Sequence, residues 1–265
     1  MDLITKITAP NPGVFTGGGT NTYLIGKDDI TLVDPGPNIS EHLDEIIKAG
    51  DGKIKRIFVT HTHTDHSPAA LPLSKTLNVP MYGRLVDGES LWEDETFIPD
   101  IVLNDKDIIE TDEYTLEVIH TPGHASNHLC FLIKDTKCLL TGDHIMDGST
   151  VVIGPPDGNM KSYINSLEKL LDFDIDCFAP GHGNYIHEPE KAIQSIIRHR
   201  LTRERKALRK LGEAGISSLD KLTELVYDDV SEMLHPIAKY SLEAHLLKLI
   251  DEKKVKLDKD LFEIV

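Results

Sequence analysis

The sequence predicts an α/β protein of layered sheets and helices, followed by a small C-terminal module. Up to about residue 185, short β-branched runs alternate with helix-like stretches and with turns rich in glycine and proline. From residue 187 the pattern changes to a long helical run. Beyond it, two helix-like segments lead into a short hairpin pattern, and this order suggests a winged-helix-like module.

The elements follow one another in a regular order. Apolar, β-branched runs predict strands over 22–25, 29–34, 55–60, 114–120, 128–133 and 137–143. Helical signals cover 40–49, with Ser40 as its N-cap, then 67–77 and 160–171. The stretch G-E-A-G-I-S-S-L interrupts the long helical run, so we predict one domain over 1–211 and a second over 212–265. The second contains helices at Leu219–Tyr227 and Ile237–Ile250 and a hairpin over 253–265.

Composition narrows the class of protein. The 265 residues are 40% hydrophobic and 27% charged, as in an ordinary soluble globular protein, and they contain no apolar run long enough for a membrane span. The first residues lack the features of a secretory signal, so we expect a cytoplasmic protein without a membrane partner. Cys130, Cys138 and Cys177 lie in strand-like runs and are expected to be buried free thiols. A net charge of −16 disfavours polyanions and favours a small-molecule substrate.

The stretch T-H-T-H-T-D-H-S, residues 60–67, crowds three histidines and an aspartate together directly after an apolar strand. A packed core could not easily satisfy so many ring nitrogens, so this cluster favours a metal site. His61 and His63 are two residues apart and can point the same way from an extended segment. Asp65 and His66 would turn toward a neighbouring ion. A catalytic site needs about three protein ligands for each ion, so further ligands must come from elsewhere.

Candidates for these ligands follow later strands. His124 lies in H-T-P-G-H, Asp143 in T-G-D-H and His182 in A-P-G-H-G. Each motif follows an apolar run and contains a glycine, and tight turns at such glycines bring side chains from separate strands to one edge of a sheet.

The motifs H-T-H-T-D-H, T-P-G-H, T-G-D and P-G-H-G, in this order, resemble the metallo-β-lactamase-fold hydrolases. The resemblance implies an αββα sandwich and two zinc ions. It implies that His61, His63 and His124 hold one ion, that Asp65, His66 and His182 hold the other, and that Asp143 bridges them. It also implies that Asp34, in V-D-P-G, orients the ligands from behind. His128 is the other histidine expected to support the site or to line its cleft.

The predicted chemistry is hydrolysis. Two zinc ions about 3.5 to 4 Å apart lower the pKa of water to about 7 and can hold a bridging hydroxide that attacks a carbonyl carbon or a phosphorus. Asp65, near this nucleophile, is the catalytic candidate that would orient it or carry its proton. Zinc is favoured, although imidazole-rich sites also accept manganese, iron or nickel.

The substrate stays open between two classes. The motifs N-M-K-S-Y-I-N-S-L-E-K-L, P-G-H-G-N-Y-I-H and H-P-I-A-K-Y-S-L-E-A-H-L-L-K-L are similar to the lactamase-beta-like branch with a winged-helix-like C-terminal domain. That branch includes endoribonucleases acting on single-stranded RNA, and its close relatives include thioesterases acting on carrier proteins. A basic stripe would suit RNA: Lys191, Arg198, Arg200, Arg203, Arg205, Lys206, Arg209 and Lys210. The alternative is a solvated helix face, with Ile193, Ile197, Leu201, Leu208 and Leu211 packed inward. The acidic C-terminal module is then expected to wall the cleft or to form a homodimer contact.

Acyl substrates would need an apolar cleft. Its candidate lining residues are Phe15, Tyr23, Tyr82, Leu91, Trp92, Phe97 and Met146. A glyoxalase-type activity on glutathione thioesters ranks below these classes, and slow promiscuous turnover of β-lactams is permitted by the chemistry. A non-enzymatic binding module that has lost its metals is the alternative from a different class, and the complete ligand set argues against it.

Overall fold

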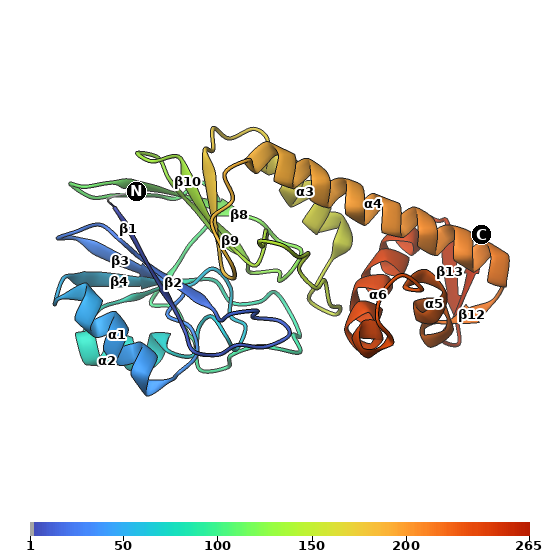
Figure 1. Cartoon of the computed structure of the whole chain (residues 1–265), viewed down its shortest axis with the longest axis horizontal. Coiled ribbons are helices and arrows are strands. Elements are labelled where there is room, and N and C mark those ends of the chain that lie inside the picture. The colour runs from blue at the N-terminus through green and yellow to red at the C-terminus, as the bar shows by residue number, and fades with distance from the viewer. Residues whose placement is uncertain (1–2) are drawn as a thin grey trace.

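The computed structural model describes residues 3–265. Figure 1 shows an elongated molecule in which a larger part, built on two sheets, is joined to a smaller C-terminal part by helix α4 (Pro189–Ala214). Within the described residues, no helix is both long enough and apolar enough to cross a bilayer.

The first sheet has six strands that lie side by side in chain order. They are β1 (Ile4–Thr8), β2 (Asn21–Ile25), β3 (Ile30–Val33), β4 (Ile54–Phe58), β5 (Met81–Gly83) and β6 (Ile101–Val102). The first three strands pair antiparallel, and β3 to β6 pair parallel. Helix α1 (Ser40–Gly50) lies in the connection between β3 and β4, and helix α2 (Ala70–Leu77) in the connection between β4 and β5, because parallel neighbours need a crossover.

The second sheet has five strands in the order β11-β10-β9-β8-β7. They are β7 (Ile108–Glu110), β8 (Thr115–His120), β9 (Leu129–Ile133), β10 (Cys138–Gly142) and β11 (Cys177–Pro180). The pairs from β7 to β10 are antiparallel, while β10 and β11 are parallel with helix α3 (Met160–Leu170) between them in the chain.

Three apolar cores hold these layers together. Phe58 of the first sheet and Phe131 of the second meet in the core between the sheets, with ring centroids 5.2 Å apart. Ile46 of α1 and Leu73 of α2 pack on the outer face of the first sheet. Helices α3 and α4 cover the outer face of the second sheet in the same way. The order helix, sheet, sheet, helix is the αββα sandwich that the resemblance implied.

The C-terminal part has its own core. It contains β12 (Ser217–Ser218), α5 (Leu219–Val226), the 3₁₀ turn η1 (Glu232–Leu234), α6 (His235–Asp251), β13 (Val255–Asp258) and β14 (Leu261–Ile264). Strands β13 and β14 form the predicted hairpin, and β12 adds to β14. Leu211 of α4 packs in this core, whereas Ile193 of the same helix packs against the second sheet. Helix α4 therefore belongs to both parts, and the division at residue 211 stays a prediction.

The structure corrects some local expectations. Ser40 is the first residue of α1 and not its N-cap, since the N-cap position is Ile39 and no side chain caps the helix. Helix α2 begins at Ala70 instead of residue 67, because the preceding residues form the loop that carries the histidine cluster. The short strands β5, β6 and β7 were not predicted. The three cysteines are buried free thiols, as predicted.

Candidate metal centre

The seven residues singled out as ligands lie at the ends of strands. His61, His63, Asp65 and His66 follow β4, and His124 follows β8. Asp143 follows β10, and His182 follows β11. All are buried except Asp65, whose side chain is 27% exposed. Residues far apart in the sequence are thus brought to one edge of the sandwich.

Their ligand atoms form three close groups. The groups are His61, His63 and His124; His61, His66 and Asp143; and Asp65, His66 and His182. Within each group the atoms that could bind a metal lie within 4.8 Å of one another. The first and third groups are the two sets that the resemblance implied, and Asp143 lies beside both. Its Oδ1 is 3.3 Å from Nε2 of His66 and 3.3 Å from Nε2 of His182, and its Oδ2 is 3.7 Å from Nε2 of His124.

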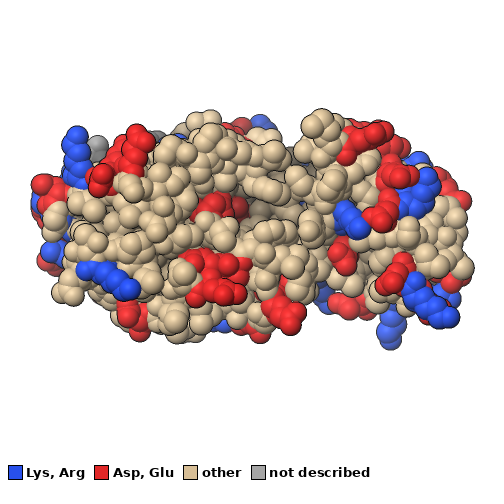
Figure 2. Space-filling model, turned by 90° about the horizontal axis from the view of Figure 1, so that it is seen from below, with Lys and Arg blue, Asp and Glu red and all other residues tan. Residues whose placement is uncertain are grey.

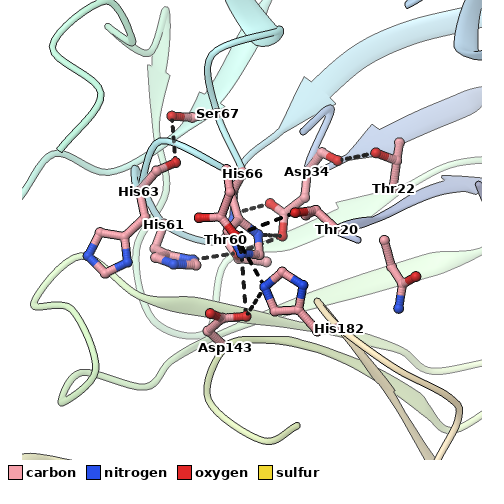
Figure 3. Close-up of polar contacts among 12 residues, drawn as sticks. Thr20, Thr22, Asp34, Thr60, His61, His63, His66, Ser67, Asp143 and His182 are labelled. Atoms are coloured by element: carbon pink, nitrogen blue, oxygen red, sulfur yellow. Dashed lines mark hydrogen bonds and ion pairs between the residues drawn. The ribbon is translucent and has the colours of Figure 1, made fainter. Parts of the chain in front are cut away.

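Asp34 fixes the orientation of two histidines (Figure 3). Its Oδ2 accepts a hydrogen bond from Nδ1 of His66 at 2.9 Å and another from the Thr60 hydroxyl at 2.7 Å, while its Oδ1 accepts from the Thr60 backbone N–H at 2.7 Å. Because the Thr60 hydroxyl donates its only proton to Asp34, its oxygen must accept from Nδ1 of His61, 3.0 Å away. Both imidazoles therefore carry a proton on Nδ1, so Nε2 is the ring atom of each that is available to bind a metal.

Backbone carbonyls orient two further histidines in the same way. Nδ1 of His124 donates to the carbonyl of Val152 at 2.7 Å, and Nδ1 of His182 donates to the carbonyl of Gly19 at 3.1 Å. Gly19 has a φ of +132°, and a Cβ there would lie 2.0 Å from the carbonyl oxygen of Ala9, so only glycine fits. The G-G-G stretch, residues 17–19, thus contributes to the site through this carbonyl.

Among the seven ligand candidates, four buried imidazole nitrogens and one carboxylate oxygen form no hydrogen bond. Within residues 3–265, Nε2 of His61, His66, His124 and His182 and Oδ1 of Asp143 have no hydrogen-bond partner. Buried polar atoms are normally paired, and each unpaired one is costly. Lone pairs that converge from several strands are what a divalent metal ion requires, so these residues fit a metal centre.

The charges in the cluster favour added positive charge. Burial lowers the pKa of His182, but the carboxylates of Asp143 and Asp65 outweigh it and raise that pKa to about 10. Burial likewise lowers the pKa of His66, yet Asp65, Asp143 and Asp34 hold it well above its usual range. By contrast, burial and the neighbouring histidines hold the pKa of His61 well below its usual range. The side near Asp65 and Asp143 therefore attracts cations, and the side near His61 offers neutral ligands.

Two further histidines lie beneath the cluster. His128 is fully buried, so the expectation that it lines the cleft is wrong. Its Nδ1 contacts the hydroxyl of Thr121 at 2.9 Å, and its Nε2 accepts the backbone N–H of Asp143 at 3.2 Å. It therefore holds the chain that carries Asp143. His144 is also fully buried and packs against the ring of Tyr163, with ring centroids 5.1 Å apart, so it is not a surface residue.

A cavity of about 470 Å³ opens above the cluster. It is bordered by His63, Asp65, His124 and Asp143 on the side of the metal centre. Figure 2 shows the face of the molecule that is hollowed between its two parts, with a mostly uncharged middle, a few acidic side chains around the hollow and most Lys and Arg toward the two ends.

Both parts of the molecule supply walls of the cavity. From the sandwich come Val14, Phe15, Trp92, Met146, Val151 and Val152. From the C-terminal part come Tyr227, Val230, Leu234, Ile237, Ala238 and Ser241. The expectation that the C-terminal module walls the cleft is confirmed. Trp92 links the two parts, because its ring lies 5.9 Å from that of His63 and 5.2 Å from that of Tyr240 on α6.

Sequence reasoning identified only some of the lining residues. Phe15, Trp92 and Met146 border the cavity as expected. Tyr23 and Phe97 belong to apolar cores, Tyr82 packs against one, and Leu91 is exposed on the surface. The wall formed by α4, with His199, Arg200 and Arg203, was not predicted. The basic stripe of this helix gave a signal, but nothing in it distinguished the residues that turn toward the cavity.

Two family models match the chain. The model of the metallo-beta-lactamase superfamily matches residues 15–182, and that of the beta-lactamase associated winged helix domain matches residues 218–263. Among curated proteins, the chain is 31% identical to a beta-lactamase-like protein 2 homolog of Drosophila melanogaster over 97% of this chain and 90% of the relative. It is 29% identical to an atrochrysone carboxyl ACP thioesterase of Aspergillus chevalieri over 96% of this chain and 83% of the relative.

Solved structures share all or part of this architecture. The metallo-beta-lactamase family protein TTHA1429 from Thermus thermophilus superposes with a TM-score of 0.85 at 19% identity, over 100% of this chain and 99% of that one. The protein TTHA1623, solved in a di-iron-bound form, superposes with a TM-score of 0.57 at 24% identity, over 71% of this chain and 96% of that one. At these identities the similarity establishes the fold.

Proposed function

Because the chain belongs to the metallo-beta-lactamase superfamily, we propose that it is a metal-dependent hydrolase of acyl substrates, with thioesters as the preferred class. The observation that carries this proposal is the largely apolar cavity above the cluster of unpaired ligand atoms. Its volume of about 470 Å³ is in the range of small-molecule sites. The relative named as a carrier-protein thioesterase supports the same class.

The proposed cofactor is a pair of zinc ions. His61, His63 and His124 would hold one ion, Asp65, His66 and His182 the other, and Asp143 both. The donors are imidazoles and carboxylates with no thiolate, a set that suits zinc although it does not exclude iron or manganese. When bound, such a pair lowers the pKa of water and polarises the bond under attack.

The chain itself orients the site and manages protons. Asp34 and Thr60 hold two of the imidazoles in the tautomer that leaves Nε2 free, so the ligands need no reorganisation. Asp65 is the ligand candidate most open to the cavity, and its Oδ2 lies 3.4 Å from the hydroxyl of Thr20. This position suits a carboxylate that accepts a proton at Oδ2 from an attacking water. The apolar walls exclude other water from the acyl group.

The charges on α4 favour an acyl substrate over single-stranded RNA. Arg203 pairs with Asp229, Lys206 with Asp228 and Asp229, and Arg209 with Glu213. Basic groups that are neutralised within the chain contribute little to phosphate binding. The endoribonuclease activity, the cytoplasmic location and the homodimer expected from the sequence stay predictions.

The test combines metal analysis with a substrate panel. Zinc-loaded protein is given N-acetylcysteamine and carrier-bound acyl thioesters, S-lactoylglutathione, nitrocefin and a labelled single-stranded RNA. We expect bound zinc and thioester turnover that is lost in Asp65→Ala and retained in Asp44→Ala, a matched change on the exposed face of α1. RNA cleavage without thioester turnover would replace the proposal with a nuclease. A protein that binds less than one metal ion per chain would be a binding module instead.

A further inference from the structure

Arg200 is a buried cation in the wall of the cavity. It lies on α4, its exposed fraction is 3%, and it borders the same cavity as His124 and Asp143. Its Nη2 donates to the carbonyl of Val151, and its guanidinium carbon lies 5.2 Å from the ring centroid of Tyr163. Its Nε has no hydrogen-bond partner among residues 3–265.

No carboxylate among the described residues forms an ion pair with this guanidinium. Its charged neighbours on the helix, Arg203 and Glu204, do form ion pairs. Arg203, which also borders the cavity, forms a bidentate pair with Asp229, with N–O distances of 2.7 and 3.1 Å. Glu204, one turn after Arg200, instead accepts hydrogen bonds from His245 at 3.2 Å and from Lys248 at 2.8 Å. Among residues 3–265, no side chain therefore compensates the positive charge of Arg200.

An unpaired charge inside a protein is strongly unfavourable, and Arg is always protonated in proteins. One carbonyl and one aromatic ring account for only part of its five N–H donors. A ligand that supplies a negative charge would complete the pairing. Two neighbouring carbonyls also connect the guanidinium to the metal centre. Arg200 donates to the carbonyl of Val151, and the ligand candidate His124 donates to the carbonyl of the next residue, Val152.

We propose that Arg200 binds an anionic group of the substrate and that this group is a carboxylate on the acyl chain, remote from the bond that is cleaved. The proposal rests on the proposed acyl hydrolase. One uncompensated cation matches one negative charge, and the planar guanidinium suits a carboxylate geometrically. The apolar residues Met146, Val151 and Val152, which border the same cavity, suit the hydrocarbon part of such a chain.

The first test compares two thioesters that differ only in this charge. They are the N-acetylcysteamine thioester of adipic acid, with its free carboxylate, and the methyl ester of the same compound. We expect the wild type to favour the carboxylate in kcat/KM by about 10- to 100-fold, as for a buried charge-assisted pair. Arg200→Gln should abolish this preference and Arg200→Lys should retain part of it. Arg205→Gln, which changes an exposed arginine of the same helix that does not border the cavity, should preserve the preference.

The second test measures binding without turnover. Adipate should raise the melting temperature of the metal-loaded wild type and of Arg205→Gln, whereas adipamide should not, and adipate should have no effect on Arg200→Gln. Equal protection of the wild type and Arg200→Gln by adipate would overturn the proposal and leave Arg200 as a structural tie to residue 151. Stronger protection by hexyl phosphate than by adipate would overturn the assignment to a carboxylate.

The two measurements separate this inference from the proposed function. Adipate binding that depends on Arg200, without hydrolysis of either thioester, would remove the acyl hydrolase and keep the anion site. Hydrolysis of both thioesters at equal rates, unchanged in Arg200→Gln, would keep the hydrolase and remove the anion site. If Arg200→Gln does not fold, as circular dichroism would show, the wild type and Arg200→Lys carry both comparisons. Equal kcat/KM of the wild type for the two thioesters, together with equal melting temperatures in adipate and adipamide, would then overturn the inference.

Discussion

The molecule contains two buried clusters of the same residue types with opposite properties. In the sandwich, His61, His66, His124, His182 and Asp143 direct buried atoms toward a common space and leave them without hydrogen bonds. In the C-terminal part, Glu204 accepts hydrogen bonds from His245 and from Lys248, and its acidic and basic groups satisfy one another. Only Nε2 of His245 has no partner there among residues 3–265.

The difference shows how a buried polar cluster indicates its role. A cluster whose hydrogen bonds close on themselves stabilises a fold and needs nothing from outside. In the other cluster, each of the four histidines is anchored by a hydrogen bond at Nδ1 alone. Their Nε2 atoms are then presented to a ligand. The first kind should fail by unfolding when it is changed, and the second should fail by losing metal.

The largest effect is expected from Asp143→Asn. This change removes charge from the carboxylate that lies between the ligand groups, so metal content should fall by at least half. Thioester kcat/KM should fall by more than about 100-fold, the upper end of the effect of changes behind a metal site. Elemental analysis and kinetics on the same preparation measure both. A variant with full metal content and activity would contradict the role given to Asp143.

A smaller effect on the same cluster is expected from Asp34→Asn. The amide removes the charged acceptor for His66 and Thr60, so metal affinity should fall by about 10- to 100-fold. Asp34 has a φ of 49°, which asparagine tolerates, so the backbone should be preserved. Competition with a chelator measures the affinity. Asp100→Asn, which changes a carboxylate bonded to the backbone N–H of Met81, is the matched control and should bind metal normally.

The closed cluster should respond in the opposite way. Glu204→Gln should lower the free energy of unfolding by about 1–3 kcal/mol, because the Lys248 ammonium and the His245 imidazole lose their anionic acceptor. Urea unfolding measures this loss, and metal content should stay normal. If Glu204→Gln lost metal but kept its free energy of unfolding, the contrast between the two clusters would be wrong.

The effect of Glu204 should also depend on pH. Burial raises its pKa, but the hydrogen bonds from His245 and Lys248 outweigh burial and hold the pKa below its usual range. A lowered folded-state pKa stabilises the protein above the unfolded value, about 4.3, and this contribution is lost as the pH falls through the folded-state pKa. The difference in the free energy of unfolding between the wild type and Glu204→Gln should therefore become smaller at acid pH. A constant difference from pH 7 down to acid unfolding would exclude this explanation.

The smallest effect is expected outside both clusters. Arg209 and Glu213 form an exposed ion pair on α4 with an N–O distance of 2.8 Å, and their side chains are 58% and 54% exposed. Arg209→Gln should lower the free energy of unfolding by about 0.3–0.5 kcal/mol, and high salt should remove even this difference. Binding of a labelled RNA by this variant, compared with wild type, also tests whether the helix face contributes to nucleic-acid affinity, and we expect no change.

Much of the fold was predictable because its local patterns are strong. The runs that become β2, β3, β4, β8, β9 and β10 carry β-branched and apolar residues and end at glycine or polar turns. Strands β1 and β11 were not assigned as separate elements, and the other strands that were missed, β5, β6, β7 and β12, are only two or three residues long. Such short segments acquire their strand conformation from the neighbours with which they pair, so their own sequence carries little signal.

The kinds and the order of the residues at the metal centre follow from the amino-acid sequence alone. Each ligand candidate directly follows a strand or lies in the loop after one, and strand ends are marked locally by apolar runs and glycines. What these residues meet depends on the folded chain: the carbonyl of Gly19 that orients His182, and the C-terminal wall of the cavity. Helix α4 carries several basic residues, and only the tertiary structure decides that Arg200 is buried with an Nε that has no hydrogen-bond partner among residues 3–265. Periodicity assigns a residue to a face of its helix, whereas charge pairing depends on contacts with distant segments of the chain.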